Sequence, residues 1–188
     1  MARRGAALMS AAWPLPASFV VDCSVIAGMF LADEASPLAA AVRDGCSSLK
    51  LVAPPLLRVE FANVALSARR KGRLDALGFR DLLDQGERIP VHYDPTEPSL
   101  PNYADAAWEF GVTSYDYAYL DCARRRGLPL ATLDRRLAEA ALRAGVEVLT
   151  DRLATSEPGI DYRTPHAAPS GARAERKPRR ATRVQPIP

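Results

Sequence analysis

Four acidic residues, Asp22, Glu60, Asp116 and Asp134, each follow or adjoin a short apolar segment of the chain. Wide intervals separate them, so only a folded domain can bring them together. Carboxylates crowded into one cleft repel one another and take up protons at neutral pH unless a cation compensates their charge. Hard oxygen ligands of this kind suit Mg²⁺ or Mn²⁺, which keep several waters and engage substrate phosphates. The four residues therefore predict an acidic metal site for phosphoryl chemistry.

Other catalytic groups are scarce in this sequence. Its only histidines are His92 and His166, which argues against a His-based triad or a zinc site. Neither a GxxxxGK[ST] phosphate loop nor a GxGxxG turn is found. The cysteines Cys23, Cys46 and Cys122 are odd in number, match no metal or redox spacing, and suit a reducing cytoplasm. Metal-activated water remains as the expected nucleophile.

The elements that must position these residues alternate between strand and helix. Short apolar runs predict the strands, and three- and four-residue periodicity with Gly or Pro boundaries predicts the helices. The predicted strands cover residues 19–22, 51–53, 89–93 (an edge strand), 128–132 and 146–149, and the helices 24–31, 37–44, 56–71, 74–86, 102–110, 115–126 and 134–144. This alternation predicts an α/β domain with a mainly parallel sheet and helices on both faces.

The predicted fold gives the four carboxylates a common location. Ligand sites in parallel sheets form outside the carboxyl ends of the strands. Asp22 and Asp134 follow strands there, while Glu60 and Asp116 lie early in helices, so all four can face one edge. Any one of them alone is more simply explained as a helix cap or dipole partner. Their recurrence at successive strand-helix junctions favours the site.

Bulk properties indicate one domain and a distinct tail. The chain has 188 residues, 48% of them apolar, with no uninterrupted apolar run long enough to span a membrane. We expect a disordered leader over residues 1–18, a domain over 19–150 and a disordered tail over 151–188, rich in Pro and Arg. The net charge of +3 combines +6 in residues 163–188 with −3 in the rest, so the basic character belongs to the tail.

Four segments resemble, in order and spacing, the motifs of the PIN-domain ribonucleases, in particular the VapC-type toxins of bacterial type II toxin-antitoxin pairs. Residues 20–25 resemble the first motif and residues 53–64 the second. Residues 115–120 are similar to the third, and residues 130–137 to the fourth. The resemblance implies a three-layer α/β/α fold with the acidic site at the carboxyl ends of the strands. It implies Mg²⁺- or Mn²⁺-dependent endonucleolytic cleavage of RNA in the cytoplasm.

Residue roles follow from the same resemblance. Asp22, Glu60, Asp116 and Asp134 become the catalytic and metal-binding acids, and the polar residues that would support them are Ser24, Asn63 and Thr132. The family also implies a cognate antitoxin whose C-terminal segment occupies the cleft, and a homodimer or a toxin-antitoxin hetero-oligomer.

Two features depart from the family pattern. Asp121 stands where relatives more often carry a small apolar residue, and its position five residues after Asp116 predicts an exposed or interface side chain. The basic tail lies beyond the usual end of the domain, and we expect it either to add RNA affinity or to remain disordered.

RNA contact requires positive charge, which three basic runs of the predicted domain offer. Residues 69–71 and 124–126 are more simply read as solvated helix ends, whereas Arg135 adjoins Asp134 and is the better candidate for substrate binding. A second hypothesis of a different class is a catalytically silent PIN-like module that binds RNA or protein.

Overall fold

The computed structural model describes residues 15–151. Most of the predicted leader and nearly all of the predicted tail lie outside these residues. Ser18, assigned to the leader from sequence, opens the first strand, and Leu15 packs against the core. The domain therefore begins before residue 19.

A five-stranded parallel sheet forms the centre of the fold, in the order β3-β2-β1-β4-β5. Its strands are β1 (Ser18–Val21), β2 (Lys50–Ala53), β3 (Val91–Tyr93), β4 (Leu130–Ala131) and β5 (Val148–Leu149). Strand β1 is central and pairs with both β2 and β4. The predicted parallel sheet is confirmed, as is the edge position of β3.

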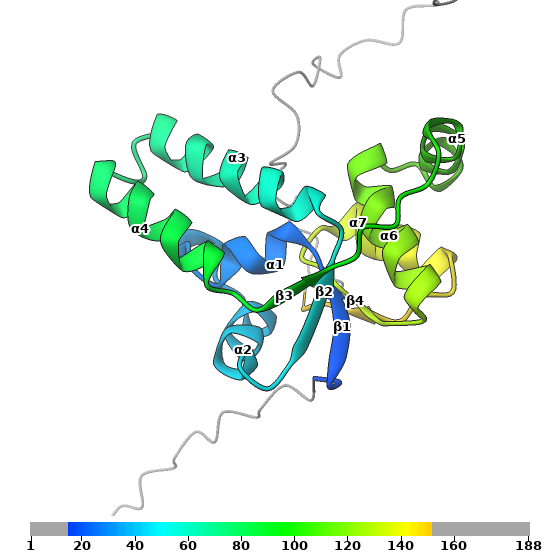
Figure 1. Ribbon diagram of the computed structural model, residues 1–188, viewed down its shortest axis with the longest axis horizontal. Helices are drawn as coiled ribbons and strands as arrows, with labels where there is room; N and C mark the ends of the chain where they lie inside the picture. The colour runs from blue at the N-terminus through cyan, green and yellow to red at the C-terminus, as the bar shows by residue number, and fades with distance from the viewer. Residues whose placement is uncertain (1–14, 152–188) are drawn as a thin grey trace, which may run out of the picture.

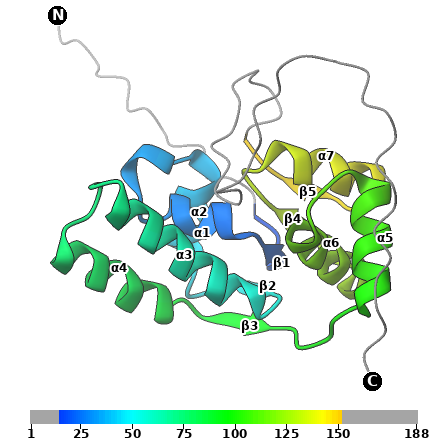
Figure 2. The same cartoon turned by 90° about the horizontal axis from the view of Figure 1, so that it is seen from above.

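Helices flank the sheet on both sides, which confirms the α/β/α arrangement. Figure 2 shows α1 to α4 on one side of the strands and α5, α6 and α7 on the other. The helices are α1 (Cys23–Gly28), α2 (Pro37–Gly45), α3 (Leu56–Arg70), α4 (Ala76–Glu87), α5 (Leu100–Phe110), α6 (Ser114–Arg126) and α7 (Arg135–Arg143), with a 3-10 turn at Ala32–Glu34. Helices α3 and α4 form a long antiparallel pair (Figure 1).

The core follows from burial of the sheet on both faces. Phe19, Val20 and Val21 of β1 are fully buried although they point alternately to opposite faces. A strand covered by helices on both sides reads as a continuous apolar run, which is the pattern of residues 19–21. Within residues 15–151, no helix combines the length and apolar character that crossing a membrane requires.

Helix α1 is shorter than its sequence predicts, ending at Gly28 instead of continuing to Leu31. A Cβ at Gly28 would lie 2.8 Å from the carbonyl oxygen of Glu34. The 3-10 turn thus approaches the end of α1 closely, and only glycine leaves room for it. This turn delivers the chain to α2, which packs beside α1.

Candidate active site

Asp22 lies where β1 ends and α1 begins, and its side chain is fully buried. One carboxylate oxygen, Oδ2, accepts hydrogen bonds from three donors. Ser24 donates from its hydroxyl at 2.6 Å and from its backbone N–H at 3.3 Å, and Thr132 donates from Oγ1 at 2.9 Å. Hydrogen bonds to a carboxylate are among the stronger ones in proteins, so they fix the orientation of Asp22.

The same two hydroxyls join Asp22 to the turn after β4. The backbone N–H of Leu133 donates to Ser24 Oγ at 2.9 Å, and that of Asp134 donates to Thr132 Oγ1 at 3.0 Å. Each hydroxyl therefore donates to Asp22 and accepts from the β4–α7 turn. Because β1 and β4 are neighbours, the structure brings Asp22, Ser24, Thr132 and Asp134 together as one hydrogen-bonded unit.

Asp134 caps the N-terminus of α7, as the simpler explanation of its position predicts. Its Oδ1 accepts from the backbone N–H groups of Arg136 and Leu137, at 2.8 and 3.1 Å. Capping by an aspartate stabilises the exposed donors of a helix start and its dipole.

Glu60 lies in the second turn of α3 and is half-buried. The hydroxyl of Tyr119, on α6, donates a short hydrogen bond to Glu60 Oε2. Burial raises the pKa of Tyr119 well above its ordinary value, and nearby Cys23, Glu60 and Asp22 add to the rise. The phenol therefore stays protonated as a donor, and it lies within electrostatic reach of two of the four acids.

Asp116 is the third residue of α6 and is nearly fully buried. Its Oδ2 accepts from Thr113, at 2.7 Å from the hydroxyl and 3.1 Å from the backbone N–H. The N–H of Asp116 in turn donates to Thr113 Oγ1 at 3.1 Å, completing a capping box. Asp116 and Tyr119 are three residues apart, so they share one face of α6.

Two predicted residues lie at more exposed positions. Asn63, one turn after Glu60 on α3, is exposed. Arg135, at the start of α7, is largely exposed, and its guanidinium Nε pairs with Glu139 at 2.8 Å within the same helix. Asn63 remains a predicted support residue, and Arg135 a predicted RNA contact.

The donor set fits a hard divalent cation by its chemistry, because all four predicted ligands are carboxylates. Within residues 15–151, however, no three acidic, His or Cys side chains are grouped closely enough to hold a metal ion. Hydrogen bonds orient three of the acids: Ser24 and Thr132 hold Asp22, Thr113 holds Asp116 and Tyr119 holds Glu60.

Another acid at the end of a strand, Asp94, escaped the sequence interpretation. It directly follows β3 and is buried, and its Oδ2 pairs with Arg125 Nη1 at 2.9 Å and Arg126 Nε at 2.8 Å. The hydrogen bond from Arg126 is the main cause that lowers the pKa of Asp94 far below its ordinary value. Burial raises the pKa of the adjacent Cys122 thiol to about 12. This ion-pair cluster ties α6 to the β3 edge.

The cluster also explains the basic run 124–126. Arg125 and Arg126 pair with Asp94, while the Arg124 guanidinium lies 5.8 Å from the centroid of the Phe110 ring. These contacts agree with the prediction that the run is a helix end.

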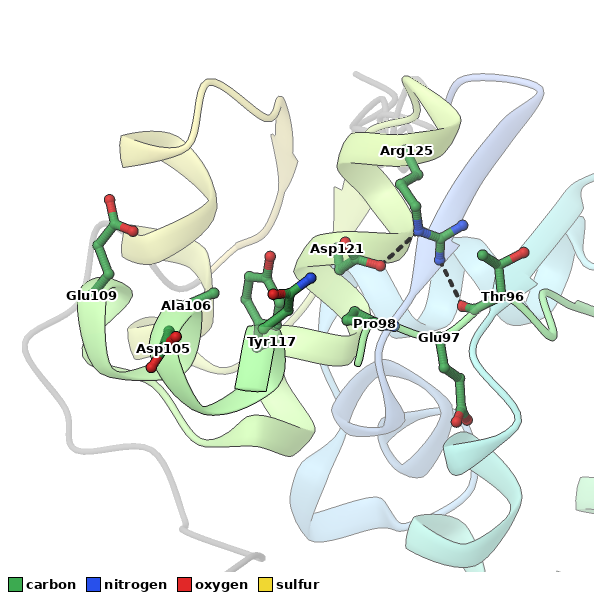
Figure 3. A pocket seen from close by; sticks show the side chains of 10 residues that line it. Thr96, Glu97, Pro98, Asp105, Ala106, Glu109, Tyr117, Asp121 and Arg125 are labelled. Atoms are coloured by element: carbon green, nitrogen blue, oxygen red, sulfur yellow. Dashed lines mark hydrogen bonds and ion pairs between the residues drawn. The ribbon is translucent and has the colours of Figure 1, made fainter. Parts of the chain in front are cut away.

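A cleft of about 390 Å³ lies between α5, α6 and the loop that precedes α5 (Figure 3). Its acidic lining consists of Glu97, Asp105, Glu109 and Asp121. The side chain of Asp121 is only 14% exposed and pairs with Arg125 at 2.6 Å, so of the two predicted alternatives, exposed or interface, the exposed one is wrong. None of the four predicted site acids lines this cleft. Its negative charge disfavours RNA phosphates.

Comparisons with known proteins agree with the fold. A family model described as "PIN domain" matches residues 19–142. Among solved structures, the chain is similar to one described as "Crystal structure of PAE2754 from Pyrobaculum aerophilum". The sequence identity is 27% and the TM-score 0.51, covering 70% of this chain and 83% of that one. A search of curated proteins found no match.

Proposed function

The chain belongs to the PIN-domain family, and from that premise we propose that it is a metal-dependent endoribonuclease acting as the toxin of a toxin-antitoxin pair. The fold is of nuclease type. The observation that supports catalysis best is the pair of hydroxyls, Ser24 Oγ and Thr132 Oγ1, which holds buried Asp22 against the turn that carries Asp134. Burying an ionised carboxylate costs a fold stability, so a carboxylate that is buried and oriented in this way favours a role in binding.

Asp22, Glu60, Asp116 and Asp134 are the residues that would hold Mg²⁺ or Mn²⁺. When bound, such a cation supplies Lewis-acid activation of water and stabilises charge on the scissile phosphate. The protein's part is to orient the acids. Three of them have a polar neighbour that does so: Ser24 and Thr132 for Asp22, Tyr119 for Glu60, and Thr113 for Asp116.

Residues 15–151 carry a net negative charge, with 19 acidic and 15 basic side chains. RNA binding therefore requires positive charge concentrated at one place on the surface. Arg135 and Arg136 are exposed and immediately follow Asp134, which places two cations next to the proposed site. The cleft between α5 and α6 is acidic and lies on the other face of α6. We therefore propose that RNA approaches over the start of α7.

A cytoplasmic antitoxin is the partner that this function requires. The proposed mode of neutralisation is an arginine of the antitoxin that pairs with the site carboxylates, since guanidinium and carboxylate groups form bidentate hydrogen bonds. An antitoxin bound in this way would exclude both the cation and the RNA.

The test is cleavage of RNA by the purified protein with Mg²⁺ or Mn²⁺. Asp22→Asn and Asp116→Asn each remove a charge while keeping the shape of the side chain, and each is expected to lower the rate by at least about 100-fold. Asp84→Asn makes the same chemical change at an exposed position on α4 and should cut like the wild type.

Thermal unfolding of all three variants shows whether the fold is retained. If the Asp22 and Asp116 variants are folded and cut as fast as the wild type, the assignment of the site is wrong. Expression in a bacterial host tests the toxin role: growth should arrest with the wild type and continue with Asp116→Asn. Growth unaffected by an active nuclease would contradict that role.

A further inference from the structure

The chain leaves the described domain beside the candidate site. Strand β5 ends at Leu149, whose carbonyl oxygen accepts a hydrogen bond from the N–H of Thr132 at 3.1 Å. Thr132 is the residue whose hydroxyl holds Asp22. Two residues later, Asp151 Oδ2 accepts from the N–H of Leu38 in the first turn of α2, at 3.3 Å. Whatever follows residue 151 therefore starts at the same sheet edge as the acids.

The sequence that follows has the opposite charge to the domain. Residues 15–151 are acidic on balance, with 19 acidic against 15 basic residues, whereas residues 152–188 hold eight basic and three acidic ones. Six of the basic residues fall in a segment of eleven, which we call the basic cluster: Arg173, Arg176, Lys177, Arg179, Arg180 and Arg183. The only acid in this segment is Glu175.

The tether between domain and cluster is long enough for the cluster to reach the site. Residues 152–172 span at most roughly 70 Å when fully extended. This tether starts just after Leu149, which bonds to the backbone of Thr132, the residue that holds Asp22. A binding group on a tether of this kind has an effective concentration on the order of 1 mM at a nearby site. Even a weak interaction is then populated.

We propose that the basic cluster binds the acidic site of its own chain and inhibits it. The inference rests on the proposed function, because it assigns a regulatory ligand to the same carboxylates. Arginine guanidinium groups form charge-assisted, often bidentate hydrogen bonds with carboxylates. In that position the cluster competes with a divalent cation for its ligands and with RNA for access. An RNA-binding role for the tail predicts the opposite effect of removing its charge.

The experiment uses the full-length chain with all six basic residues of the cluster replaced by Ser. Mn²⁺ affinity is measured by isothermal titration calorimetry, and cleavage of a short RNA is measured in parallel. A control variant carries Ser at six uncharged tail positions instead: Thr164, Pro165, Pro169, Thr182, Val184 and Gln185. With an effective concentration near 1 mM and a dissociation constant of roughly 0.1 to 1 mM, relief of competition should tighten Mn²⁺ binding about 2- to 10-fold.

The outcomes separate the inference from the function on which it rests. Tighter Mn²⁺ binding and faster cleavage by the cluster variant, with the control like the wild type and the difference shrinking at high salt, support self-inhibition. Unchanged or weaker Mn²⁺ binding overturns it, and slower cleavage with unchanged Mn²⁺ binding assigns the tail to RNA instead. If neither the wild type nor any variant binds Mn²⁺ or cuts RNA, the proposed function fails, and the inference falls with it.

Discussion

The hydrogen bond between Tyr119 and Glu60 allows the sharpest test of how the site is held. Tyr119→Phe deletes one oxygen from a fully buried side chain and leaves the packing of its ring intact. A hydrogen bond to a charged group contributes about 1.5 to 3 kcal/mol to the free energy of unfolding. For a domain of this size, that loss corresponds to a fall in melting temperature of roughly 5 to 12 °C.

The same change should weaken metal binding. Glu60 is a proposed ligand, and the Tyr119 hydroxyl is the donor that orients its Oε2. Loss of a group that orients a metal ligand typically lowers metal affinity about 10- to 100-fold. Calorimetry with Mn²⁺ measures this directly, independently of RNA cleavage. Tyr115→Phe is the matched control, because Tyr115 lies on the same helix and its side chain is 52% exposed.

Alkaline unfolding gives a second readout with a defined sign. Burial holds the pKa of Tyr119 well above the ordinary value of 10.0, so the protonated phenol stabilises the fold fully below about pH 10. That contribution is lost as the pH rises above 10, because the unfolded chain then ionises first. The wild type should lose stability in that range more steeply than Tyr119→Phe. A variant that matches the wild type in melting temperature, Mn²⁺ affinity and alkaline stability would refute the positioning role.

Two further predictions concern stability. Asp94→Asn should lower the free energy of unfolding by about 2 to 3 kcal/mol at pH 7, since it removes the charge that pairs with Arg125 and Arg126, themselves partly exposed. Because the pKa of Asp94 is lowered in the folded state, the stability that its charge contributes is present above pH 4 and lost as the pH falls further. Urea titrations should therefore show the stabilities of wild type and variant converging in acid. A difference that stays constant with pH would contradict the ion-pair account. Gly86→Ala places a Cβ 2.3 Å from Cε1 of the buried Phe61 ring. Helices α3 and α4 must then shift, which should lower the free energy of unfolding by about 1 to 3 kcal/mol. An unfolding midpoint equal to or above that of the wild type would show that the ring moves freely.

The sequence predicts the fold because its local signals agree with the tertiary structure. Periodicity marks α3 almost to the residue, from Leu56 to Arg70, and the apolar run 19–21 marks the central strand. Strand order is a different matter. Nothing local states that β4, more than a hundred residues after β1, pairs with it, yet this pairing brings Thr132 to Asp22. Only the resemblance to a family predicted that these two residues serve one site.

Asp94 shows why an acid at the end of a strand does not identify a site by itself. It follows β3 as Asp22 follows β1, and both are buried. Their contacts within residues 15–151 differ: the hydroxyls of Ser24 and Thr132 donate to Asp22, whereas Asp94 pairs with the guanidinium groups of Arg125 and Arg126. Neutral donors orient a carboxylate without cancelling its charge, whereas two cations do cancel it. Two guanidinium groups make Asp94 part of an ion-pair cluster, whereas hydroxyls orient Asp22, and only tertiary contacts make that distinction.

Tyr119 escaped the sequence interpretation for a related reason. Residues 116–120 of α6 are all buried, so the helix lacks the polar stripe that would single out one side chain on a particular face. In such a helix a tyrosine reads simply as core, and its hydroxyl has meaning only through a partner on another helix, here Glu60 on α3. A buried tyrosine hydroxyl usually needs a hydrogen-bond partner. Glu60, predicted at the same edge of the sheet, was the one signal in the sequence that indicated such a partner for Tyr119. Pairing each buried phenol with the nearest predicted acid would have found the contact once the sheet order was known.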